Sequence, residues 1–136
     1  MKRQPTEEQK AKAKERREQF AKLCHQVAAM TEEQRAQFSK RAPILTAEGR
    51  VLSPTNQILL AYQREHVTIV GGFQQWREQR RAVRKGESAL AIWIPRKDKE
   101  DPNRQPGEIS SADLKEMQFF MGNVFDISQT QPIEAE

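Results

Sequence analysis

The sequence predicts an α+β protein in which N-terminal helices precede a small antiparallel sheet and a short tryptophan-bearing helix. Residues 6–30 and 31–41 consist of good helix formers and contain no Gly or Pro. Residues 89–94 and 117–127, in contrast, are short apolar runs typical of strands. Because helical and extended segments do not alternate along the chain, an α+β arrangement is favoured over an α/β one.

The first 45 residues are expected to form a charged helical arm. In the first helix, only the second half carries apolar residues at helical spacing, namely Phe20, Leu23, Cys24 and Val27. A capping-box pattern from Thr31 to Gln34 predicts that a second helix begins there and runs to Arg41, before Pro43. The alternating charges before residue 18 predict a solvated helix or a frayed segment.

The remaining elements follow from local start and stop signals. Ser53 and Pro54 predict a helix that runs to about Glu65, because Pro is favoured at the first helical position. A short helix is expected over residues 73–81, with Trp76 on it, after a short extended run at residues 66–70. The simplest sheet is a hairpin of residues 89–95 with 117–127 around a polar loop at 96–110. Residues 67–70 could add a third strand.

Basic residues concentrate in the front of the chain. The net charge is +4, but residues 1–41 hold 11 Lys and Arg against 6 Asp and Glu, whereas residues 101–136 hold 2 against 7. Five of the nine residues from 77 to 85 are basic. Such a cluster predicts a polyanionic partner, since binding it would release counterions. The alternative is a solvated charged surface.

Several function classes are disfavoured. Cys24 is the only cysteine, and neither His25 nor His66 belongs to a metal-binding or catalytic motif, so we expect no metal, no cofactor and no enzymatic activity. No long apolar segment and no signal-peptide pattern are present, which predicts a cytoplasmic protein without membrane contact. A small-molecule substrate is not expected.

Aromatic and basic residues interleave between residues 56 and 87. This mixture suits single-stranded nucleic acid, because bases stack on aromatic rings while cations follow the phosphates. The interleaved residues are Tyr62, Arg64, Phe73, Trp76, Arg77, Arg81, Arg84 and Lys85. For Phe73 and Trp76, packing in the core is an equally good interpretation of their helical spacing.

Three motifs in order carry a family resemblance: Pro54-Thr55-Asn56-Gln57, then Trp76 followed by the 81–87 segment RAVRKGE, then the 124–130 segment VFDISQT. Together they resemble the N-terminal single-stranded-DNA-binding domain of ArdC-type antirestriction proteins, also found on TraC-type plasmid primases. The chain departs from the family at Arg80, where a Gly is usual, and at Ser88, where a Lys is frequent. It also lacks the H-E-x-x-H of the metalloprotease-like domain.

The resemblance implies an ArdC-like domain over residues 46–130, after the arm at 1–45 and before an acidic tail at 131–136. It also implies largely sequence-independent binding of single-stranded DNA, in the antirestriction setting of plasmids, phages and other mobile genetic elements. The residues expected at the DNA are Asn56, Tyr62, Trp76, Arg77, Arg80, Arg81, Arg84, Lys85 and Gly86. In this hypothesis Arg81, Arg84 and Lys85 hold phosphates, Trp76 and Tyr62 stack on bases, and Asn56 donates a hydrogen bond.

A protein–protein module is the alternative hypothesis. In it, the protein is an inhibitor or adaptor whose charged helix of residues 6–30 docks on a protein partner, and the basic turn of residues 83–87 is incidental. The sequence contains no helix-turn-helix or RNP signature that would favour duplex DNA or an RNA-recognition fold. The choice between DNA and RNA stays open at this stage.

Overall fold

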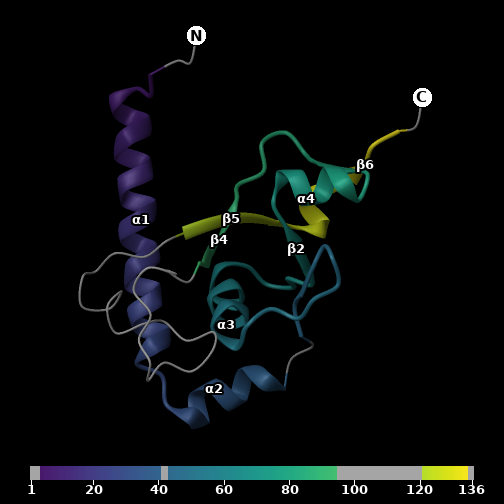
Figure 1. The fold of residues 1–136 in the computed structure, drawn as a ribbon. Coiled ribbons are helices and arrows are strands. Elements are labelled where there is room, and N and C mark those ends of the chain that lie inside the picture. Colours follow the sequence, from purple (N-terminus) through teal and green to yellow (C-terminus); the bar gives the residue numbers. More distant parts are fainter. Residues whose placement is uncertain (1–3, 41–42, 95–120, 135–136) are drawn as a thin grey trace.

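The computed structural model describes residues 4–40, 43–94 and 121–134 (Figure 1). In chain order, the elements are α1 (Glu7–Ala28), α2 (Glu32–Ser39), β1 (Leu45–Thr46), α3 (Pro54–Gln63), β2 (Ile69–Gly71), α4 (Phe73–Glu78), β3 (Arg81–Val83), β4 (Leu90–Trp93), β5 (Met121–Asp126), the 3-10 helix η1 (Ile127–Gln129) and β6 (Thr130–Pro132). The α+β class is confirmed, and Trp76 lies in the short helix α4.

Four strands form the main sheet, in the order β1-β2-β5-β4. The expected hairpin is confirmed, because β4 pairs antiparallel with β5 and places Leu90 opposite Val124. Strand β2 is the third strand, antiparallel to β5, with Val70 opposite Asp126. The structure adds two features: β1 pairs parallel with β2, and β3 pairs with β6 in a separate two-stranded sheet.

The helix starts follow the sequence signals. The side chains of Thr6 and Thr31 each accept a hydrogen bond from the backbone N–H three residues later. The glutamine at that later position accepts a hydrogen bond from the threonine's own N–H, so both helices begin with a complete capping box. Helix α3 begins with the Ser53 cap and Pro54. These caps satisfy N–H groups that would otherwise lack a partner at the helix start.

The second half of α1 is part of the core. Its apolar face packs with α3 and β4 in one cluster of buried residues: Phe20, Cys24, Val27, Ile58, Leu59, Ala91 and Trp93. A second cluster joins α3 to the sheet and contains Ile44, Leu60, Val70, Leu90 and Val124. The first half of α1 is exposed and extends beyond the sheet (Figure 1).

Two expected elements differ in extent. The helix expected over 73–81 ends at Glu78, and Arg80 takes a left-handed conformation with φ 58°, which turns the chain into β3. The segment 131–136, expected to be a tail, contributes residues to β6 instead, because their backbone pairs with Arg81 and Ala82. The loop at 96–110 and the start of the 117–127 strand lie outside the described residues.

Candidate nucleic-acid interface

Asn56 lies in the interior, 8% exposed. Its Nδ2 donates to the carbonyl oxygen of Trp93 at 3.0 Å, and its Oδ1 accepts from the Trp93 N–H at 2.7 Å. Gln63 makes the same pair of bonds to Ala91, at 2.7 and 2.8 Å. The structure thus binds the Asn56 amide to the chain's own backbone, through one of its two N–H donors and through its oxygen, and buries it away from the surface.

Trp76 is also buried, with 2% of its surface exposed. Its indole Nε1 donates to the carbonyl oxygen of Phe125 at 2.9 Å, which satisfies the one polar atom of the ring. The ring lies against Gly71, where a Cβ would approach it to 3.3 Å. In this conformation Trp76 offers no exposed face for a base, so the core interpretation describes its position.

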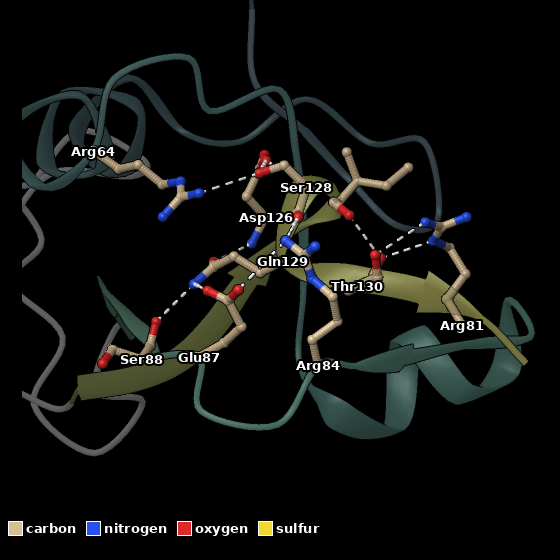
Figure 2. A network of polar contacts seen from close by, with 10 residues as sticks. Arg64, Arg81, Arg84, Glu87, Ser88, Asp126, Ser128, Gln129 and Thr130 are labelled. Atoms are coloured by element: carbon tan, nitrogen blue, oxygen red, sulfur yellow. Dashed lines mark hydrogen bonds and ion pairs between the residues drawn. The ribbon is translucent and has the colours of Figure 1, made fainter.

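The segment 124–130 folds into a tight corner between β5 and β6 (Figure 2). Asp126 caps η1, accepting from the Ser128 N–H and hydroxyl with one oxygen and from the N–H groups of Thr68 and Ile69 with the other. Gln129 accepts from the Asp126 N–H and donates to the carbonyl oxygen of Ser88 at 2.8 Å. The corner therefore ties β2, β5 and the 84–88 turn together.

Asp126 is charged at neutral pH despite its burial. Desolvation of the 1%-exposed side chain opposes ionisation, but the hydrogen bonds donated by the Ser128 hydroxyl and by the three backbone N–H groups outweigh it. The net result is a pKa below the ordinary value of an aspartate. The carboxylate is thus a fixed structural acceptor.

Two of the expected phosphate-binding cations are also bound to this corner (Figure 2). Arg81 donates from Nε to the Thr130 hydroxyl at 2.7 Å and from Nη2 to the Thr130 carbonyl. Arg84 donates to the Ser128 carbonyl and forms an ion pair with Glu87 at 3.4 Å. Both arginines hold the basic turn in place, and only part of each guanidinium remains for a ligand.

The other expected cations, Arg77, Arg80 and Lys85, are exposed. Within the described residues, no ion pair or side-chain hydrogen bond holds any of them. Gly86, beside Lys85, has φ 88°, and among the described residues no atom beyond its two chain neighbours lies within 4 Å of the position a Cβ would take. The turn thus presents an open backbone next to an unpaired cation.

Among the described residues, two aromatic side chains are largely exposed. Tyr62 is 47% exposed and packs against Phe38, with ring centroids 5.6 Å apart. Phe73 is 61% exposed and rests on the buried Phe125, with centroids 4.8 Å apart. Because Phe73 lies one helical turn before Arg77 on α4, a ring and a cation stand together there. Phe73 belongs to the interleaved aromatic and basic residues of the sequence, but it is not among the residues expected to contact DNA.

We call the exposed residues Phe73, Arg77, Arg80, Lys85 and Gly86 the basic surface. Beside its turn lies a groove of about 990 Å³ between α1, the end of α3 and residues 86–91. Its charged lining residues are Lys12, Glu15, Arg16, Lys22, Arg64 and Glu87. Sequence reasoning missed this groove, because it treated the first half of α1 as solvated.

Two further properties concern the described residues alone. They contain no cluster of three His, Cys, Asp or Glu side chains arranged to hold a metal ion. None of their helices combines the length and apolar character needed to cross a bilayer.

The fold and this surface define a small α+β domain that presents exposed cations, one of which, Arg77, lies a helical turn from the exposed ring of Phe73. The chain matches the family model of the N-terminal domain of anti-restriction factor ArdC over residues 14–125 and belongs to that family. The match begins inside α1 and includes the basic surface.

Among solved structures, the chain is similar to the Mn(II)-bound crystal structure of the antirestriction ArdC protein from plasmid R388, with 16% identity and a TM-score of 0.47. The alignment covers 85% of this chain but 40% of that protein, so the similarity concerns a part of the plasmid protein. No curated protein matches the chain.

Proposed function

We propose that this protein binds single-stranded DNA through the basic surface, in an antirestriction-related role. The observation that carries the proposal is that two of the basic residues are bound within the fold and three are not. Arg81 and Arg84 are bound to the 124–130 corner, whereas Arg77, Arg80 and Lys85 are exposed, and Arg77 lies one helical turn from the exposed ring of Phe73. A surface that binds single-stranded DNA needs cations that contact the phosphates and an aromatic ring on which a base can stack.

Each exposed residue has a role in the proposal. Arg77, Arg80 and Lys85 contact phosphates, and the Gly86 N–H lies beside Lys85 where an anion can approach the backbone. Phe73 stacks on a base, supported from below by Phe125. Tyr62 lies on α3, outside the basic surface, and is proposed as a second ring that stacks on a base. Phosphate contacts and ring stacking carry little information about base identity, which favours binding with little sequence preference.

The test is fluorescence anisotropy with a labelled mixed-sequence oligonucleotide, single-stranded and then duplex, across a salt series. The variant Arg77→Ala/Arg80→Asn/Lys85→Ala removes three cations, and Asn is chosen at position 80 because it tolerates positive φ. Each lost phosphate contact reduces the log–log salt slope by about 0.7 for a single strand, so we expect a drop of roughly 2.

The matched control is Lys10→Ala/Lys14→Ala/Lys40→Ala, which removes the same charge from exposed positions outside the basic surface. We expect the control to keep most of the wild-type slope. Equal slopes for both triple variants would remove the basic surface from the proposal. No binding by the wild-type protein at low salt would overturn the function itself.

A further inference from the structure

One face of α1 lines the groove beside the basic turn. Its lining residues recur every three or four positions, at Lys12, Glu15, Arg16, Gln19, Lys22, Leu23 and Gln26. This spacing places them on one side of the helix, whereas Lys10 and Lys14 stand roughly 200° around from Lys12. The exposed first half of α1 thus has a distinct side turned toward the groove.

The walls of the groove carry more positive than negative charge. Lys12, Arg16 and Lys22 come from α1, and Arg64 comes from the end of α3. Both acidic residues keep their charge, although Glu87 is paired with Arg84. Among the cations, Lys12 forms an exposed ion pair with Glu8 at 3.5 Å, and Arg64 donates to the Ser128 hydroxyl at 3.4 Å. Because four cations face two acidic side chains, the net potential inside the groove is positive.

Arg16 fixes the spacing of the two walls. Its Nη1 donates to Asn123 Oδ1 at 2.7 Å, and its Nη2 donates to the Ala89 carbonyl oxygen at 3.4 Å. These bonds connect the middle of α1 to β5 and to the start of β4. The groove is thus held open between a braced helix and the turn that contains Gly86 and Glu87.

The groove is continuous with the basic surface, because Gly86 belongs to both and Lys85 is the next residue. We propose that it carries the sugar–phosphate backbone of the single strand onward from the basic surface, with Lys12, Lys22 and Arg64 contacting phosphates. Lys12 and Lys22 stand roughly 15 Å apart along the helix, so they meet different phosphates. The inference rests on the proposed function and makes α1 part of the same interface.

Lysine-to-alanine pairs on α1 test the inference directly. Lys12→Ala/Lys22→Ala removes two groove cations, and Lys10→Ala/Lys14→Ala removes two from the opposite side with the same change in net charge. All four positions are exposed, and alanine preserves helix propensity. Their surface ion pairs with Glu7, Glu8 and Glu18 contribute little to stability. Thermal melting by circular dichroism verifies that both variants fold.

We expect the groove pair to bind a labelled single strand roughly tenfold or more weakly at about 0.1 M salt, with a salt slope lower by about 1.4. The opposite pair should stay within about threefold of the wild type. Equal losses for both pairs, or none for the groove pair while the wild type binds, would overturn the groove and leave the basic surface standing. Failure of the wild type to bind would overturn both proposals.

Discussion

Asn56 and Gln63 lie two turns apart on α3, and each uses its side-chain amide to mimic a strand beside β4. Both amides donate to one backbone carbonyl and accept from the N–H of the same residue, Trp93 for Asn56 and Ala91 for Gln63. Because β4 is an outer strand of the main sheet, these residues would otherwise present unpaired polar groups at that edge. Helix α3 therefore supplies hydrogen-bond partners to the outer edge of β4, in the place of a further strand.

Replacing Asn56 with Ala should destabilise the fold by about 1–3 kcal/mol, because the buried N–H and carbonyl of Trp93 lose their partners. The exposed Gln74→Ala on α4 is the control and should stay within about 0.5 kcal/mol. Urea unfolding measures both. Unchanged stability together with weaker DNA binding would instead return Asn56 to the interface.

Asp126 should make stability depend on pH in the acidic range. Its folded-state pKa is lowered, so its stabilising contribution is complete above the unfolded value of about 3.9 and is lost as the pH falls through the lower folded value. Asp126→Asn removes the charge and faces an amide against backbone donors, which should cost about 2–3 kcal/mol at pH 7.

The difference in unfolding free energy between the wild type and Asp126→Asn should therefore narrow as the pH drops below about 4. Urea denaturation at a series of pH values from 7 to the lowest at which both fold gives this difference directly. A gap that widens toward low pH would contradict the assignment of a charged, hydrogen-bonded carboxylate.

Substitutions at Phe73 and Trp76 should affect different properties, DNA affinity for Phe73 and stability for Trp76. Phe73→Leu keeps an apolar cover over Phe125 but removes the flat ring, so single-stranded DNA affinity should fall by about 1–3 kcal/mol with little change in thermal stability. Trp76→Phe loses the bond to the Phe125 carbonyl and should lower stability while the folded protein keeps its affinity. The reverse pattern in anisotropy and melting curves would restore Trp76 as the stacking ring.

Gly86→Ala should cost about 1 kcal/mol through the backbone alone, because φ is 88° and no neighbouring atom obstructs the added methyl group. Gly72→Ala makes a suitable comparison. Gly72 has an ordinary φ of −76°, and its added Cβ would meet its nearest neighbours at 3.7 Å and beyond. Equal melting temperatures for the two variants would argue against backbone strain at the basic turn.

The elements that the sequence predicts well are those with local signals. Capping boxes, the Ser53–Pro54 start and the apolar runs of the hairpin each specify an element within a few residues. Strands β1 and β6 were not expected, because they contain two and three residues and form through pairing with distant segments. Such short strands have too few residues to show a period.

The candidate site was predicted in composition but not in arrangement. The cluster at 77–85 marks the basic surface, yet only the fold shows that Arg81 and Arg84 are bound by the 124–130 corner. Trp76 and Asn56 have residue types that suit an interface and a core equally, and their burial depends on distant strands. The α1 side of the groove had a detectable signal: Lys12, Arg16, Gln19 and Lys22 recur at helical spacing.

The pairing of β3 with β6 also bears on how fast the basic turn can form. Val83 lies opposite Thr130, so two strands of three residues must meet across a long intervening stretch of chain. When segments so far apart in sequence come together, the chain loses conformational entropy before the new contacts stabilise it, and this slows folding. The helices, with their local contacts, are free to assemble first. We therefore expect a kinetic order in which α1 and α3 associate early, and the turn that carries Lys85 takes its final shape among the last parts of the molecule.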